Sequence, residues 1–203
     1  MRLEQDRIDE ILDVAAEAFI AGGFEGASVN EIARRANASK TTLYSRFPTK
    51  QKLFIAVLER RMNLVFSQVS TALPTDAPIE STLKKFGARL LQLALSKDQI
   101  VLLRVVSMES KRFPELGEHF YDLGPRRGIN QLAHYMREQI KRGRLVKEDP
   151  VIMAEHLSSL LIGSPLRRVL LGLASTLDTK GRQERIDAAV KVFLLAYSTK
   201  KIR

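Results

Sequence analysis

Apolar side chains recur at intervals of three and four residues along most of the chain, and this spacing restricts the protein to helical architectures. The pattern is clear in residues 4–21, where it comprises Ile8, Ile11, Leu12, Ala15, Ala18 and Phe19. Residues spaced in this way share one face of an α-helix. The sequence lacks alternating β-branched runs bounded by turns, which would indicate strands. We therefore predict an all-α fold.

Local signals predict where the first helices begin and end. Gly22-Gly23 should end the first helix, because glycine readily adopts the left-handed conformation. Ser28-Val29-Asn30-Glu31 matches a capping box, in which the Glu31 carboxylate would reach back to the Ser28 N–H. Ser39 can cap the next helix, and Pro48 closes it. Thr49 can then cap a long connecting helix over 51–73.

The rest of the chain reads as helices after a linker-like segment at 74–78. The predicted helices span 79–95, 97–110, 114–123, 126–142, 150–172 and 181–199. Ser96-Lys97-Asp98-Gln99 forms a second capping box, and Asp149-Pro150 supplies an N-cap followed by proline at the first helical position. Pro165 should kink the helix in which it lies.

Composition excludes several classes of protein. The 203 residues contain no cysteine, which excludes disulfides, thiolate metal sites and a cysteine nucleophile. The first ten residues are too charged for a signal peptide, and no 18-residue apolar run is present. We expect a soluble, cytoplasmic protein that needs no cofactor or metal.

The net charge of +10 is unevenly distributed. Residues 1–27 carry two basic and seven acidic side chains, whereas residues 28–52 carry six basic side chains and one acidic. The first 60 residues are therefore neutral overall but polarised, and the excess positive charge lies beyond them. A basic protein favours partners such as nucleic acid, anionic membranes or acidic ligands.

Residues 28–47 combine two short helices with a tight turn, which is the geometry of a helix-turn-helix. The second helix of that motif lies in the major groove of DNA. Its polar residues can donate hydrogen bonds to phosphates or bases. They are Ser39, Lys40, Thr41, Thr42, Tyr44, Ser45 and Arg46. Spacing alone fits an ordinary helical hairpin with a solvated basic face equally well.

The residues themselves resemble the TetR family of bacterial transcriptional regulators. The resemblance runs without a gap through Ala15–Phe19, Gly22–Phe24, Ser28–Ala33 and Ala38–Leu53. Two positions differ from the commonest pattern: Thr41 stands where glycine is frequent, and Ser45-Arg46 replaces a frequent aromatic, His or Arg pair. Both changes retain hydrogen-bonding capacity, so they bear on the operator sequence rather than on DNA binding.

This resemblance implies an all-helical homodimer of about nine helices per chain. Residues 1–50 would bind a palindromic double-stranded operator, and residues 51–203 would bind a small-molecule effector and dimerise. The protein would be a ligand-responsive regulator, usually a repressor, rather than an enzyme. By position, Tyr44 and Lys50 should contact phosphates, and Lys40, Thr41 and Thr42 should approach bases; Ser28 completes the predicted DNA-binding set. Arg112–Leu116, Phe120-Tyr121 and Gly143–Leu145 also resemble one C-terminal subgroup.

Two helices carry stripes suited to dimerisation, which across a two-fold axis would build a four-helix bundle. The predicted interface comprises Met153, Leu157, Leu161, Ser164, Ile186, Val190, Phe193, Leu194 and Tyr197. The alternative is that both stripes face the core of their own chain.

An effector pocket is expected among the central helices. Its candidates are Phe86, Leu90, Leu103, Arg104, Val106, Phe120, Tyr121, Leu132, Met136 and Leu160. Arg104 stands among apolar residues, where a charge needs a partner. That partner would be a carboxylate such as Glu109 or Glu138, or an anionic effector.

Two other classes of function are alternatives to a transcriptional regulator. A basic helical module could bind anionic membranes, although the absence of tryptophan counts against it. A small enzyme could use the face that carries Glu115, His119 and Asp122, but such clusters are far more often solvated surface. No phosphate loop or nucleophile motif supports catalysis.

Overall fold

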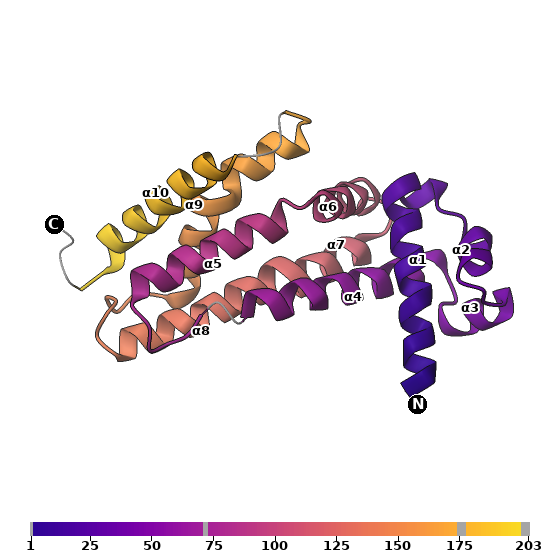
Figure 1. Ribbon diagram of the computed structural model, residues 1–203, viewed down its shortest axis with the longest axis horizontal. Helices are drawn as coiled ribbons and strands as arrows, with labels where there is room; N and C mark the ends of the chain where they lie inside the picture. Colours follow the sequence, from indigo (N-terminus) through magenta and orange to yellow (C-terminus); the bar gives the residue numbers. More distant parts are fainter. Residues whose placement is uncertain (1, 71–72, 174–177, 200–203) are drawn as a thin grey trace. The chain divides into compact units, whose positions relative to one another are not determined.

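The computed structural model describes residues 2–70, 73–173 and 178–199, and these residues form an all-helical fold (Figure 1). Ten α-helices and one π-helix are present in the described part of the chain, at these bounds: α1 Arg2–Gly26, α2 Val29–Arg35, α3 Lys40–Arg46, α4 Lys50–Ser70, α5 Ile79–Ala94, α6 Lys97–Glu109, α7 Pro114–Tyr121, η1 Asp122–Arg126, α8 Arg127–Lys141, α9 Pro150–Leu170 and α10 Thr179–Tyr197. The predicted fold class is confirmed. No helix within those ranges is both long and apolar enough to cross a membrane.

The predicted helix boundaries agree with the structure to within a few residues, with three differences. Gly23 adopts a non-helical conformation (φ 67°), but one helical turn follows it as far as Gly26. The described part of α4 ends at Ser70 rather than near residue 73; residues 71–72 lie outside the described residues. Pro165 is buried inside α9, which continues through it to Leu170.

A π-helix, η1, occupies residues 122–126, where the sequence predicted the end of one helix and the start of another. Pro125 lies inside it. Proline has no N–H to donate and clashes with the preceding turn of an α-helix, so a locally wider helical turn is a common solution. The chain therefore continues from α7 into α8 in helical form.

The chain divides into two compact units, each made of two separate stretches of sequence. Unit 1 comprises residues 1–64 and 101–123, and unit 2 comprises residues 65–100 and 124–203. Helix α4 thus begins in unit 1 and ends in unit 2. Residues 101–109 of α6 and all of α7 belong with the N-terminal helices.

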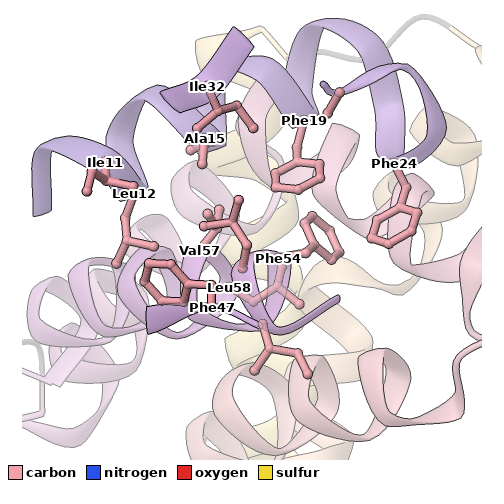
Figure 2. Packing of buried hydrophobic residues seen from close by; sticks show 14 of the residues in the cluster. Ile11, Leu12, Ala15, Phe19, Phe24, Ile32, Phe47, Phe54, Val57 and Leu58 are labelled. Carbon is pink, nitrogen blue, oxygen red and sulfur yellow. The ribbon is translucent and has the colours of Figure 1, made fainter. Parts of the chain in front are cut away.

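Unit 1 is built on an aromatic core. Phe54 of α4 packs against Phe19 and Phe24 of α1, with ring centroids 4.7 and 5.6 Å apart (Figure 2). Leu102, Val105 and Val106 of α6 and Leu116 of α7 are buried in the same cluster. The core therefore fixes α6 and α7 against α1 and α4.

Unit 2 has its own core, in which α9 packs against α8, α5 and α10 (Figure 1). Phe86, Leu132, Leu157 and Phe193 are buried there, one from each of these four helices. Gly87 of α5 lies so close to Leu161 that an added Cβ would be 2.9 Å from its side chain. Helix α5 therefore approaches α9 closely at this point.

Candidate DNA-binding site

Helices α2 and α3 and the turn between them form the predicted helix-turn-helix. Ile32 and Ala33 of α2 and Leu43 of α3 are buried in the core of unit 1, so the two helices are fixed by their apolar faces. Asn37 adopts a left-handed conformation (φ 49°), which asparagine tolerates better than most residues. The Ala38 N–H donates to the Ala33 carbonyl at 2.9 Å and closes the tight turn.

Serine caps begin both helices, as predicted. The Ser39 hydroxyl accepts from the Thr42 N–H at 2.9 Å, and the Ser28 hydroxyl accepts from the Glu31 N–H at 3.4 Å. The other half of the first capping box is wrong: the Glu31 carboxylate bonds the Arg34 guanidinium at 2.8 and 2.6 Å. These hydrogen bonds lower the pKa of Glu31.

The outward face of α3 carries the predicted DNA-binding side chains. Six residues of this set are exposed on α3 or at its cap, namely Ser39, Lys40, Thr41, Thr42, Ser45 and Arg46, and Tyr44 is 45% exposed. The hydroxyls of Ser39 and Thr42 lie 2.7 Å apart, and Ser45 Oγ donates to the Thr42 carbonyl at 2.9 Å. The hydroxyls are thus ordered on the helix, and the face is accessible to a ligand as large as DNA.

Lys50, at the start of α4, is held more firmly than the sequence indicates. Its Nζ donates to the Glu25 carbonyl at 3.0 Å and lies 5.1 Å from the centre of the Phe24 ring. An ammonium group has three donors, so this arrangement leaves Lys50 able to bind a phosphate as well. The Lys52 N–H donates to Thr49 Oγ1 at 3.2 Å, which confirms the predicted cap of α4.

The turn between α6 and α7 contributes residues that sequence reasoning did not connect with this site. Arg112 Nη1 pairs with Glu25 Oε1 at 2.6 Å, and the Phe113 and Phe24 rings are 5.6 Å apart. The Arg112–Leu116 motif therefore packs against the end of α1 beside Lys50. The signal was the motif itself, which the sequence analysis assigned only to a C-terminal subgroup.

Most of the predicted dimer residues are buried within their own chain. Seven of them belong to the core of unit 2: Met153, Leu157, Leu161, Ile186, Val190, Phe193 and Leu194. Tyr197 packs partly buried against that core, and Ser164 is exposed. The buried residues of both stripes therefore face the core of their own chain, which was the alternative to dimerisation. Other apolar side chains of α9 and α10 are exposed, including Ile152, Val192 and Leu195.

The ten effector candidates are divided between the units. Leu103, Arg104, Val106, Phe120 and Tyr121 lie in unit 1, and Phe86, Leu90, Leu132, Met136 and Leu160 lie in unit 2. Arg104 is exposed, so the apolar surroundings expected for its charge are wrong. Glu138, one of its two suggested partners, pairs with Lys141 at 2.8 Å.

Helix α8 carries a polar stripe that the sequence analysis missed. Gln131, Tyr135 and Gln139 recur every four residues along it, and Tyr135 and Gln139 are fully buried. Among the described residues, neither the Tyr135 hydroxyl nor Gln131 Oε1 has a partner at hydrogen-bond distance. Burial raises the pKa of Tyr135, whereas the nearby Thr82 hydroxyl and Arg144 lower it. Apolar residues lie between these three along α8, so the sequence alone does not show that the stripe is buried.

The face considered for catalysis has an ordinary helical structure. His119 Nδ1 lies 2.8 Å from the Glu115 carbonyl, one turn earlier in α7. In the described parts of the chain, no group of three or more His, Asp or Glu side chains could hold a metal ion.

Two family models of known proteins match this chain, one in its N-terminal part and one in its C-terminal part. Residues 11–57 match the model of the bacterial regulatory proteins of the tetR family, and residues 81–199 match the C-terminal domain of AefR-like transcriptional repressors. The transcriptional activator FasR of Mycolicibacterium smegmatis is 41% identical over 75 residues, which are 36% of this chain and 34% of FasR. The regulator RutR of Escherichia coli is 32% identical over 99 residues, 49% of this chain and 45% of RutR. The chain thus aligns with less than half of either relative.

Solved structures extend the similarity over the whole fold. A TetR-family regulator from Mesorhizobium loti has a TM-score of 0.91 at 27% identity, covering 96% of this chain and 98% of its own. The flavonoid-responsive regulator FrrA has a TM-score of 0.82 at 29% identity, covering 97% and 99%. Because unit 1 contains a helix-turn-helix and family models match residues 11–57 and 81–199, the chain belongs to the TetR family of bacterial transcriptional regulators.

Proposed function

We propose that this protein is a ligand-responsive repressor that binds a palindromic operator as a homodimer and is released from it by a small-molecule effector. The observation that carries the proposal is the capped α3 helix, with its apolar side buried and a row of hydrogen-bond donors exposed. Side chains of this kind on a recognition helix read base edges and bind phosphates.

The dimer would form through the outer faces of α9 and α10. On α9, Ile152 and Leu170 are exposed apolar residues on the side opposite the core. Gly163 lies between them, and a Cβ added to it would meet no other described atom within 4 Å. On α10, Val192 and Leu195 are 52% and 57% exposed. Helix faces of this kind pair across a two-fold axis, and a glycine allows close approach. These residues replace the buried set that the sequence indicated.

Release would follow from a shift in population. The two recognition helices of a dimer must lie about 34 Å apart to enter successive turns of the major groove. Only an effector that binds better to a differently spaced state can lower DNA affinity. Helix α4 is continuous between the units, so its tilt would change that spacing. FrrA is flavonoid-responsive by name, which makes flavonoids the first class of effector to test here.

The test is selection of bound sequences from a random duplex pool. A palindrome among the selected sequences is expected, and a pool without enrichment would contradict specific operator binding. Tyr44→Ala and Lys50→Ala should each weaken binding to the selected duplex. Lys50→Ala, which removes a cation, should also reduce the slope of log Kd against log salt by about one. Lys97→Ala, an exposed lysine at the start of α6, is the matched control and should leave the slope unchanged. A membrane-binding protein would instead prefer anionic vesicles to duplex DNA.

A further inference from the structure

The segment between α4 and α5 is held by the end of α8. The Thr75 carbonyl accepts from three side chains: Gln139 Nε2 at 3.1 Å, Arg142 Nη1 at 3.0 Å and Arg144 Nη1 at 3.4 Å. Arg144 Nη1 also donates to the Ala77 carbonyl at 3.1 Å, and Arg142 pairs with Asp76 at 2.6 Å. We call the side chains of Gln139, Arg142 and Arg144 on residues 75–77 the linker clasp.

The backbone at the end of α8 directs these side chains to the linker. Gly143 has φ 67°, and its N–H donates to the Ile140 carbonyl, while the Arg144 N–H donates to the Gln139 carbonyl, each at 2.9 Å. A glycine in this conformation ends a helix and reverses the chain. Arg144 is thereby placed beside Gln139, whose Oε1 accepts from its guanidinium at 3.2 Å. Gln139 is fully buried, so both ends of its amide are used in the clasp.

The same turn is bound to the end of α10. Thr199 Oγ1 donates to the Gly143 carbonyl at 2.7 Å, and the Thr199 N–H donates to the Arg144 carbonyl at 3.2 Å. The Val146 N–H donates to the Tyr197 carbonyl at 2.9 Å, beside a β-bridge between Leu145 and Ser198. The turn also leads directly into α9. The clasp therefore joins the linker that follows α4 to the two helices of the proposed dimer.

We propose that Arg144 is a positioning residue for operator binding. Helix α4 begins beside the recognition helix and the chain reaches the clasp a few residues after its end. Because residues 75–77 follow α4 along the chain, their attachment to the turn before α9 would bear on how each α4 is held by the dimer helices, and hence on the spacing of the two recognition helices. Arg144 acts without touching DNA. This inference rests on the proposed function, and it assigns a role to the Gly143-Arg144-Leu145 motif.

Arginine suits this position because a single guanidinium nitrogen lies within reach of three oxygens from two segments. Glutamine is too short to reach them and carries no charge. Lysine retains the charge and three donors at nearly the same reach. The conservative variant should therefore restore most of what glutamine loses.

The experiment measures the affinity of the full-length protein for the selected duplex at several salt concentrations. Arg144→Gln should weaken binding about tenfold, the loss expected for charge-assisted hydrogen bonds, with an unchanged salt slope. Arg144→Lys should stay within about threefold of the wild type. Arg137→Gln removes the same charge from an exposed position of α8 and should bind like the wild type. Dimer mass and thermal unfolding are measured for each variant.

Three results would overturn the inference: wild-type affinity in Arg144→Gln, an equal loss in Arg137→Gln, or a reduced salt slope in Arg144→Gln, which would mean a direct phosphate contact. If Arg144→Gln does not fold, Arg142→Gln removes part of the clasp from its exposed edge and should weaken binding about threefold. Wild-type affinity in that variant would likewise reject the clasp. Failure of the proposed function looks different, because the wild type itself would then enrich no duplex.

Discussion

Arg60 joins α4 to α1 through a paired hydrogen bond with one carboxylate. Its Nε and Nη2 donate to Asp13 at 3.0 and 2.9 Å, and its Nη1 lies 2.6 Å from Asp9. Arg60 is less than a quarter exposed, whereas Asp13 is half exposed. The planar guanidinium fits a carboxylate at two points, so the pair fixes the angle at which the two helices meet.

This pair gives unit 1 a dependence on acid pH. The hydrogen bond from Arg60 lowers the pKa of Asp13 below its ordinary 3.8. A carboxyl with a lowered folded pKa stabilises the protein above its unfolded pKa, and that contribution is lost as the pH falls through the folded value. Urea unfolding from pH 5 to pH 3 should therefore show a shallower loss of stability in Asp13→Asn than in the wild type. The difference should be below about 1 kcal/mol, because solvent screens the pair.

Arg60→Gln is the partner variant for this measurement. It removes the donor instead of the carboxylate, so it should make the loss of stability shallower in the same way. A wild-type slope in both variants would mean that Asp13 does not contribute to acid unfolding.

At the scale of single elements, the end of α8 combines a conformational requirement with the clasp. Gly143 has φ 67° and nothing within 4 Å of a Cβ built on it, so space does not restrict substitution but the backbone does. Gly128 lies near the start of the same helix, also with open space but without a positive φ.

The two glycines should respond to alanine with opposite signs. Gly143→Ala should lower the free energy of unfolding by about 1–2 kcal/mol, because a Cβ disfavours the left-handed region. Gly128→Ala should raise it by up to about 1 kcal/mol, because alanine loses less backbone entropy in a helix. Urea denaturation at one protein concentration measures both. Equal effects of the two substitutions would show that φ at Gly143 does not limit stability.

The elements that sequence predicted well are those governed by adjacent residues. The caps at Ser28, Ser39 and Asp149 form because a side-chain oxygen reaches an N–H two or three residues later. The direction of the Glu31 carboxylate was wrong because Arg34, one turn along, offers a charged donor. The exposure of the hydrogen-bond donors on α3 was also predictable, because they lie on the faces of the helix away from the buried Leu43.

What sequence could not determine is which apolar face meets which partner. Helices α9 and α10 are apolar on two sides, so the periodicity of Leu157 and Phe193 fits a chain core and a dimer interface equally. The packing of α6 and α7 into unit 1 depends on contacts between residues far apart in the sequence, such as Phe24 with Phe113. The burial of the Tyr135 hydroxyl likewise depends on the fold and not on its neighbours in the sequence.

At the scale of the whole molecule, the chain passes between two separate cores within α4, and again within α6 and η1. The core of unit 1 includes Leu53, Phe54 and Leu58 of α4, and unit 2 begins within the same helix at residue 65. A helix with interior hydrogen bonds along its length moves as a rod rather than bending freely. In the proposed dimer, α4 is thus one of the segments through which a change in unit 2 would reach the recognition helix.

That argument requires a dimer, and the outer face of α10 tests it. Leu195→Asp places a carboxylate in the proposed interface, where burying an unpaired charge is costly. Sedimentation equilibrium should show a folded monomer at micromolar concentration, with the helix content of the wild type. Affinity for the palindromic duplex should fall by about a hundredfold or more, because the two half-sites are no longer bound by linked DNA-binding units.

Met108→Asp introduces the same charge at a residue of α6 that is 78% exposed and should leave both mass and affinity unchanged. A Leu195→Asp protein that remains dimeric would place the interface elsewhere on the chain, and the spacing of the recognition helices would then no longer depend on α9 and α10.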